Sequence, residues 1–299
     1  MDQAVPASGP QLITVWEPRS RPQAAFIACP VFEIFYGGSR GSLKTDGALG
    51  DWLSHADLWG VNAIGLMVRR NSIQLTETVE RAKQIFKPLG FKFVESKPVH
   101  CTAPNGARLK FAYLERDSDA EEYQGHSYTR VYIEEIGNFP SPAPIMKMMA
   151  TLRSAAGVPC GFRATGNPGG PGHNWVKARY IDPAPLGWKI IKESFKNPFD
   201  GSMVEKERIF IPGKITDHTL LGPDYIASLQ MSGSPQLVKA WLEGDWNVIA
   251  GAYFPEFSTE QHVIAPFEIP KHWIRIRAMD WGSARPFSVG WYAVADGDA

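Results

Sequence analysis

A glycine-rich segment at residues 37–45 (GGSRGSLKT) carries the residue types that bind the phosphates of a nucleotide. It follows an apolar run at residues 32–36 that is typical of a strand, and it precedes a predicted helix. Glycines allow backbone N–H groups to turn inward around phosphate oxygens, and the start of a helix adds a partial positive charge. We expect Lys44 to reach the β- and γ-phosphates and the Thr45 hydroxyl to hold Mg²⁺.

Leu43 departs from the usual pattern of such a loop, in which glycine stands immediately before the lysine. If the backbone needs a positive φ there, leucine costs roughly 1–2 kcal/mol. A glycine-rich hairpin turn with a solvated lysine is the alternative interpretation. The residues predicted to bind ATP in this loop are Gly38, Ser39, Arg40, Gly41, Ser42, Leu43, Lys44 and Thr45.

A pair of acids, Glu134 and Glu135, follows the short apolar run at residues 131–133. Ligands of open α/β sheets lie at the carboxyl ends of the strands, where these acids are expected. The pattern predicts that Glu134 holds the water shell of Mg²⁺ and that Glu135 polarises the water that attacks the γ-phosphate. The usual first acid is aspartate, and a solvated acid pair at a strand end is the alternative.

A polar turn formed by Thr165, Gly166 and Asn167 follows another predicted strand at residues 160–164. A hydroxyl and an amide at this place can touch the γ-phosphate and respond to its loss. An ordinary Asn-Pro turn is the alternative interpretation.

The elements that must position these segments alternate between strands and helices. That alternation predicts an α/β fold whose mostly parallel sheet is covered by helices on both faces. Further strands are expected at residues 62–68, 108–114 and 208–211, and helices at 76–86, 141–153 and near Tyr225 and Leu237. Residues from about 182 to 246 are expected to form a smaller subdomain, and the apolar runs at 274–279 and 287–295 a hairpin that opens a new domain.

The overall composition argues against several classes of protein. The formal net charge is zero, so any contact with DNA must come from a local patch or from several subunits together. The three cysteines lack the spacing of zinc ligands. The first ten residues have no signal-peptide pattern, and no uncharged apolar run approaches the roughly 18 residues that a membrane span needs.

Taken in order, the motifs resemble those of tailed-bacteriophage terminase large subunits, the ATPases of DNA-packaging motors. The resemblance covers roughly residues 16–295. Its first part rests on the phosphate loop, residues 123–128 (YQGHSY), the acids after Ile133 and residues 165–173 (TGNPGGPGH). Residues 208–212 (RIFIP), 242–246 (LEGDW) and 280–282 (DWG) are similar to the family's lid, linker and nuclease start.

The resemblance implies an additional-strand (ASCE-type) P-loop NTPase fold, a small lid subdomain and the first hairpin of a ribonuclease H-like domain. The expected divisions are an ATPase core at residues 1–181, a lid and linker subdomain at 182–250, a linker at 251–272 and a truncated nuclease start at 273–299. In the family the nuclease uses two metal ions held by several carboxylates, and Asp280 is similar to the first of these. Because the sequence ends soon after Asp280, we expect no nuclease activity.

The resemblance also suggests roles for single residues. Gln23 would recognise adenine, Arg40 would stabilise the transferring phosphate, and Thr165, Gly166 and Asn167 would couple hydrolysis to DNA movement. The expected catalytic residues are Glu135, Lys44 and Arg40. An arginine from a neighbouring subunit often completes such sites, and the candidates are Arg116, Arg130, Arg69 and Arg70.

The implied activity is hydrolysis of ATP with Mg²⁺, coupled to translocation of double-stranded viral DNA. The implied partners are the DNA, a portal protein, a terminase small subunit and further copies of the chain in a ring. The expected place is the host cytoplasm at the procapsid portal, without membrane contact. Two alternatives stay open: another P-loop translocase such as a helicase, and a degenerate prophage remnant with weak or no ATPase activity.

Overall fold

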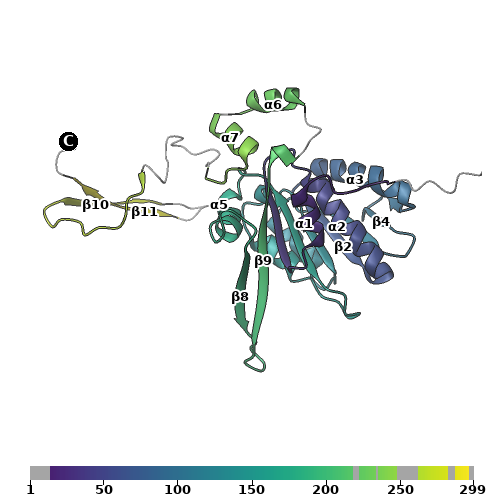
Figure 1. Ribbon diagram of the computed structural model, residues 1–299. Helices are drawn as coiled ribbons and strands as arrows, with labels where there is room; N and C mark the ends of the chain where they lie inside the picture. Colours follow the sequence, from purple (N-terminus) through teal and green to yellow (C-terminus); the bar gives the residue numbers. More distant parts are fainter. Residues whose placement is uncertain (1–13, 218–221, 234, 248–261, 282–286, 296–299) are drawn as a thin grey trace, which may run out of the picture. The chain divides into compact units, whose positions relative to one another are not determined.

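The computed structural model describes residues 14–217, 222–233, 235–247, 262–281 and 287–295. The chain divides into two compact units, Met1–Ala250 and Gly251–Ala299. Among the described residues of the first unit, nine strands form one sheet in the order β3-β4-β5-β2-β6-β7-β1-β9-β8 (Figure 1). The strands are β1 (Glu33–Gly38), β2 (Ile64–Arg69), β3 (Lys92–Val94), β4 (His100–Thr102), β5 (Arg108–Tyr113), β6 (Arg130–Ile133), β7 (Gly161–Gly166), β8 (Ile190–Lys196) and β9 (Met203–Gly213).

The middle of the sheet is parallel and its two margins are antiparallel. Strands β5, β2, β6, β7, β1 and β9 run in one direction, whereas β4 and β3 at one margin and β8 at the other pair antiparallel. Strand β7 lies between β1, which leads into the glycine-rich loop, and β6, which ends at the acid pair. The predicted α/β class and mostly parallel sheet are confirmed, and β7 occupies the position between these two strands where the resemblance implied an additional strand.

Strand β1 is buried along its whole length because the sheet is covered on both faces. Ile34 and Tyr36 belong to one apolar cluster with Trp52, whereas Phe35 belongs to a second cluster with Phe162. Successive side chains of a strand point to opposite faces, so these clusters are the cores on the two sides of the sheet. Full burial of each large apolar side chain contributes roughly 1.5–3 kcal/mol, which fixes the strand that carries the loop.

Three helices contribute to the first of these cores: α1 (Arg21–Ala28), α2 (Lys44–Trp59) and α3 (Ser72–Phe86). Helix α3 begins before the predicted residue 76 because Asn71 caps it, its side-chain oxygen accepting from the Gln74 N–H at 2.9 Å. Helices α4 (Ala143–Met149) and α5 (His173–Val176) contribute to the second core. The short helices are η1 (Gly60–Asn62), η2 (Lys87–Leu89), η3 (Asp117–Tyr123), η4 (Ile136–Asn138), η5 (Lys177–Ile181) and η6 (Ile215–Asp217).

The range 182–250, expected to form a separate lid subdomain, divides between the sheet and two helices. Strand β9 pairs with β1 from Arg208 to Gly213, while its residues 203–207 pair with β8 alone, so the two strands continue past the sheet as a hairpin (Figure 1). Helices α6 (Pro223–Gln230) and α7 (Pro235–Glu243) contact each other. Strands β8 and β9 thus belong to the nine-stranded sheet, and the division of the chain at residues 182–250 stays a prediction.

In the second unit, β10 (Ile274–Asp280) and β11 (Ser288–Val294) pair antiparallel, which confirms the predicted hairpin. Asp280 lies at the end of β10, opposite Ser288. Much of the predicted linker at 251–272 lies outside the described residues, which begin again at residue 262. The assignment of this unit to a nuclease stays a prediction.

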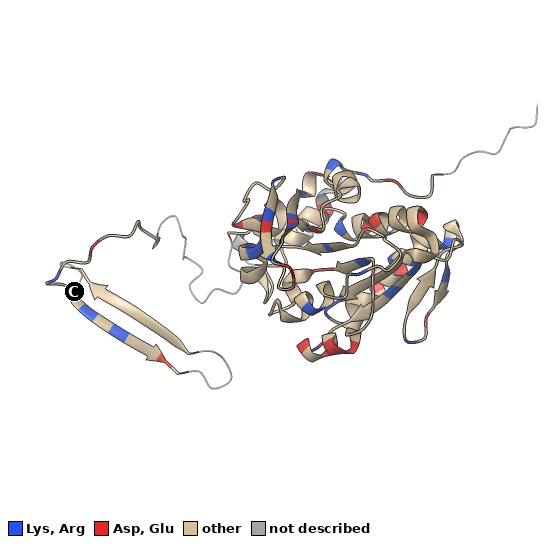
Figure 2. Cartoon of the chain, turned by 90° about the horizontal axis from the view of Figure 1, so that it is seen from below, with Lys and Arg blue, Asp and Glu red and all other residues tan. Residues whose placement is uncertain are grey.

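Charged side chains are mixed along the strands and helices of the first unit. Figure 2 shows Lys and Arg interspersed with Asp and Glu, as the net charge of zero leads one to expect. None of the helices in the described part of the chain has the length and apolar character that crossing a membrane requires.

Candidate functional site

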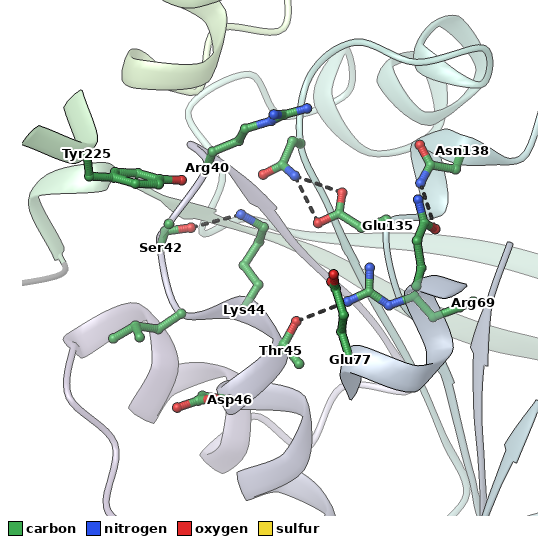
Figure 3. A pocket seen from close by; sticks show the side chains of 14 residues that line it. Arg40, Ser42, Lys44, Thr45, Asp46, Arg69, Glu77, Glu135, Asn138 and Tyr225 are labelled. Atoms are coloured by element: carbon green, nitrogen blue, oxygen red, sulfur yellow. Dashed lines mark hydrogen bonds between the residues drawn. The ribbon is translucent and has the colours of Figure 1, made fainter. Parts of the chain in front are cut away.

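A pocket of about 640 Å³ lies where β1, β6 and β7 end. Sites for small molecules commonly have volumes of about 300–1,000 Å³. Figure 3 shows Arg40, Lys44, Arg69, Glu135 and Tyr225 around the same space. The lining residues are Arg40, Gly41, Ser42, Leu43, Lys44, Thr45, Asp46, Arg69, Gln74, Glu77, Glu135, Asn138, Asn167 and Tyr225.

The glycine-rich loop leads directly into the N-terminus of α2. Lys44 is the first residue of that helix, and its ammonium group donates to the Ser39 carbonyl at 2.6 Å and to the Ser42 hydroxyl at 3.0 Å. No side chain caps this helix, so the N–H groups of its first turn are free to meet an anion. The loop therefore has the arrangement that a phosphate-binding function requires.

The start of the loop is fixed by its contacts with β9 and with the last turn of α7. Gly38 has a φ of 140°, and a Cβ there would lie 2.1 Å from the Gly213 carbonyl oxygen, so glycine is required. The Ser39 N–H donates to that same carbonyl at 2.9 Å, and the Ser39 hydroxyl donates to the Leu242 carbonyl at 2.8 Å. These contacts tie the loop to parts of the chain about 170 to 200 residues away in sequence.

Arg40 connects the loop to α7. Its N–H donates to the Trp241 carbonyl at 2.9 Å, and its guanidinium carbon lies 3.6 Å from the centre of the Trp241 ring. A cation over an aromatic face contributes roughly 0.5–2 kcal/mol. A contact between the Arg40 guanidinium and a phosphate would therefore compete with its stacking on the Trp241 ring of α7.

Leu43 has a φ of 60°, in the left-handed region that favours glycine. The sequence raised the possibility that this position needs a positive φ, at a cost to leucine, and the structure has that positive φ. The Leu43 carbonyl accepts from the Gln23 side-chain amide at 3.0 Å and from the Gly47 N–H at 3.0 Å. These two contacts hold the strained residue in place.

We expect Leu43→Gly to raise the free energy of unfolding by up to about 1 kcal/mol. The left-handed conformation costs a side chain roughly 1–2 kcal/mol, and the greater freedom of glycine in the unfolded chain returns about 0.4–1 kcal/mol. Urea unfolding measures the gain, and a nucleotide titration should show binding at least as tight as in the parent. Leu43→Ala keeps a Cβ at the same φ and is the matched control, with no expected gain. Weaker nucleotide binding by the glycine variant would contradict the idea that Leu43 strains the loop.

Gln23 lies beneath the loop and is 1% exposed. Its side-chain oxygen accepts from the Arg19 N–H at 2.6 Å, and its amide nitrogen donates to Leu43. Both ends of the amide thus bind the chain itself, and the residue supports the loop. Its contact with adenine stays a prediction.

Glu134 is completely buried at the end of β6. Its Oε2 accepts from Arg69 Nε at 3.0 Å and from the Thr78 hydroxyl at 2.7 Å. Its Oε1 is buried and has no hydrogen-bond partner among the described residues. A carboxylate oxygen left in this way is unusual, because buried polar atoms are almost always paired.

Glu135 is turned into the pocket by a left-handed backbone with a φ of 50°. Both of its carboxylate oxygens accept from the Asn167 side-chain amide, at 2.9 and 2.7 Å, and its N–H donates to the Thr165 hydroxyl at 3.3 Å. The predicted acids and the predicted polar turn therefore meet, because β6 and β7 are neighbours in the sheet. Strained backbone at a non-glycine residue is most common at functional sites.

The charge of Lys44 is strongly affected by its surroundings. Burial lowers the pKa of Lys44 to about 8, the nearby carboxylates of Glu135 and Glu134 oppose that change, and Arg40 and Arg69 add to it. A polyanion in the pocket would favour the protonated form. A bound anion would therefore raise the pKa of Lys44 and keep its ammonium group charged.

The arginine candidates are separated by the fold. Arg69 lines the pocket, whereas Arg130 lies at the opposite end of β6, 3.4 Å from Asp51 and bonded to the Pro159 carbonyl at 2.7 Å. Arg70 pairs with Asp117 at 3.3 Å, and Arg116 is exposed at the start of η3. Arg130 is therefore engaged inside its own chain, which argues against the predicted action on a neighbour.

Asp280 belongs to the second unit and is no part of this pocket. Within the described ranges, no three His, Cys, Asp or Glu side chains group closely enough to hold a metal ion.

Several lining residues were missed by the sequence reasoning. Asp46 follows Thr45 directly and is held by Arg81 through two contacts of 2.7 and 2.6 Å. Gln74 and Glu77 are three residues apart on α3, a spacing that places both on one face of a helix. The position of Tyr225 had no local signal, because α6 is brought to the loop by long-range folding.

Comparison with protein families gives one match over most of the chain. The family model described as "Terminase large subunit, T4likevirus-type, N-terminal" matches residues 36–261. No curated protein sequence matches the chain.

Solved structures with the same fold include the large terminase of a thermophilic bacteriophage. Its complex with ADP superposes with a TM-score of 0.60 at 16% identity, over 94% of this chain and 66% of that chain. Its complex with ATP-gamma-S gives a TM-score of 0.59 at 15% identity, with the same coverage. This chain thus spans 66% of the length of these structures, and at this identity the likeness concerns the fold.

Proposed function

We propose that this chain, which belongs to the terminase large subunit family, hydrolyses ATP to move double-stranded viral DNA into a capsid. The observation that carries the proposal is one pocket in which Lys44, Thr45 and Glu135 meet, with Glu134 directly behind them. The family match sets aside the alternative of another P-loop translocase. The alternative of a degenerate relative without turnover is tested below.

The nucleotide would bind with its phosphates between the loop and the start of α2. The N–H groups of the loop, Lys44 and the helix N-terminus provide the positive charge. The large terminase of the thermophilic bacteriophage binds ADP and ATP-gamma-S, which supports a nucleotide in the corresponding pocket. Gln23, which holds the loop from below, is proposed to lie near adenine.

The donor set fits a Mg²⁺ ion beside the phosphates. Hard divalent cations prefer oxygen ligands, and the Thr45 hydroxyl together with the partnerless Oε1 of Glu134 would hold one, the acid directly or through water. When bound, the ion neutralises charge on the phosphates. Arg69, which lies between these two residues, must adjust to admit it.

Glu135 is proposed to orient and polarise the attacking water. The Glu135 carboxylate and the Asn167 side chain both border the pocket. The Asn167 amide donates to both oxygens of the Glu135 carboxylate and fixes its position. A change in Asn167 when the γ-phosphate departs would release Glu135, so the same pair is proposed to sense the nucleotide. Arg40 is proposed to leave the Trp241 ring and stabilise the charge of the transferring phosphoryl group.

The turn formed by Thr165, Gly166 and Asn167 is proposed to couple hydrolysis to movement. Just after it, the Gly169 N–H donates to His173 Nδ1 at 2.9 Å, so Nε2 carries the proton and donates to the Trp246 carbonyl at 3.1 Å. The His173 and Trp246 rings also stack, with centres 5.3 Å apart. Trp246 follows α7, so a shift of the turn would be transmitted toward the predicted lid and linker.

The partners are proposed from the family. A neutral chain offers little non-specific attraction to DNA, because that attraction grows with the number of phosphates neutralised at once. A ring of copies at a portal protein, with a small subunit that selects the viral DNA, would supply the missing contacts. We place this assembly in the host cytoplasm at the procapsid, and we assign Asp280 to the start of a nuclease domain.

An ATPase assay of the chain tests the proposal. We expect phosphate release from ATP with Mg²⁺ and none with EDTA, because phosphoryl transfer needs the metal ion to neutralise the charge that develops on the phosphates. A catalytically impaired variant, purified in the same way, controls for contaminating ATPases. If the parent releases no more phosphate than that variant, the degenerate relative is the better description.

A further inference from the structure

The side chain of Arg69 joins the two residues proposed to hold Mg²⁺. Its Nε donates to Glu134 Oε2 at 3.0 Å. Its Nη2 lies 3.5 Å from the Thr45 hydroxyl, the contact that Figure 3 marks with a dashed line. A positively charged group of the chain itself therefore lies between a hydroxyl in the first turn of α2 and a buried acid.

The position of this guanidinium is well defined. Arg69 ends β2, next to β6 in the sheet, and its side chain is 11% exposed. The Thr78 hydroxyl accepts from Arg69 Nε at 3.0 Å and donates to the same Glu134 oxygen at 2.7 Å. A buried ion pair with such support resists rearrangement more than an exposed one, because its charges are little screened.

Two features separate this arrangement from an ordinary structural ion pair. Arg69 lines the nucleotide pocket, so one end of its guanidinium faces the space where phosphates would lie. Glu134 also keeps one buried oxygen without a partner among the described residues, although a full cation stands beside the other. The acid is thus only partly satisfied by Arg69.

We propose that Arg69 is a built-in cation that competes with Mg²⁺ at Thr45 and Glu134. This inference rests on the proposed nucleotide site and deepens it. Two cations beside one buried carboxylate repel each other, so binding of the metal ion weakens the contacts of Arg69 and the contacts of Arg69 weaken binding of the metal ion.

The competition has opposite consequences with and without Mg²⁺. Without the metal ion, Arg69 beside Thr45 supplies positive charge to the phosphates and supports nucleotide binding. With the metal ion, Arg69 must be displaced, and that displacement reduces the affinity. Removal of Arg69 should therefore weaken binding in EDTA and strengthen binding in Mg²⁺.

The test compares ADP affinities by calorimetry, in EDTA and in excess Mg²⁺, for the parent and for Arg69→Met. We expect the ratio of the dissociation constant in EDTA to that in Mg²⁺ to rise at least tenfold in the variant. Lys192→Gln is the matched control, since it removes an exposed positive charge of β8 outside the pocket, and its ratio should equal that of the parent. Thermal unfolding establishes that each variant is folded.

Arg69→Lys is a second variant, to be measured if Arg69→Met does not fold because the buried Glu134 has lost its cation. It keeps a cation but has a single donor centre, and we expect a rise in the ratio of at least threefold. If a folded Arg69 variant has the same ratio as the parent, because both dissociation constants are unchanged or change by the same factor, the proposed competition is wrong. A parent chain that binds no ADP in either condition overturns the proposed function as well, so the two failures are distinguishable.

Discussion

Replacing Glu135 with glutamine should lower the rate of ATP hydrolysis by roughly 100-fold or more while leaving nucleotide binding intact. Glutamine has nearly the same shape and keeps one oxygen to accept from Asn167, so the pocket should persist. It lacks the negative charge that polarises the attacking water. Steady-state phosphate release measures the loss, and titration with ADP measures the binding.

Glu121→Gln is the matched control for this loss. The Glu121 carboxylate is 59% exposed and pairs with Lys147 at 2.9 Å, away from the pocket, so the same substitution there should leave turnover at the parental rate. If Glu135→Gln hydrolyses ATP as fast as the parent, the role assigned to Glu135 is wrong. A variant that also fails to bind ADP would show that Glu135 supports the pocket itself.

The parts of this site that could be predicted from the sequence are those with a local pattern. The glycine-rich loop follows a buried strand, and the acid pair follows another, so their meeting at one edge of a parallel sheet needs no knowledge of distant contacts. Helix α3 was likewise predicted, because Val79, Ala82, Ile85 and Phe86 repeat at helical spacing, and all four are buried.

The parts that could not be predicted depend on weak patterns or on long-range packing. Strands β3 and β4 have only three residues each, which is too short for an alternating pattern to stand out in the sequence, and β8 is mostly exposed and has no regular alternation. The pairing of β9 with β1 joins segments about 170 residues apart, and sequence reasoning placed β9 in a separate subdomain. The contacts of Arg69 are a further example, since an arginine at the end of a strand is usually a surface cation.

Replacing Lys44 with methionine should weaken nucleotide binding by roughly 100-fold without destabilising the fold. A charge-assisted contact with phosphate contributes about 1.5–3 kcal/mol, which the variant loses. The pKa of Lys44, lowered to about 8 by burial, means that the folded chain disfavours this charge by roughly 3 kcal/mol relative to the unfolded chain. Loss of the contacts with Ser39 and Ser42 offsets that relief, so we expect a melting temperature no lower than that of the parent.

The pH dependence of the parent distinguishes the charge of Lys44 from its shape. Phosphates favour the protonated lysine, and in the free chain this form gives way to the neutral one as the pH rises through about 8. ADP affinity should therefore fall above pH 8, and the contribution of Lys44 to the free energy of unfolding should rise, because between pH 8 and the unfolded pKa of 10.5 the unfolded chain binds the proton that the folded chain has lost. Burial raises the pKa of Cys101 and of Tyr36, which gives the opposite trend over this range, so the Lys44 contribution is measured as the difference between the parent and Lys44→Met. The last proton of a terminal phosphate leaves near pH ~6, below this window. The fall in affinity should vanish in Lys44→Met, and the parent should gain unfolding free energy relative to this variant across the same window. An equal fall in affinity in parent and variant would assign the pH dependence of binding to another group.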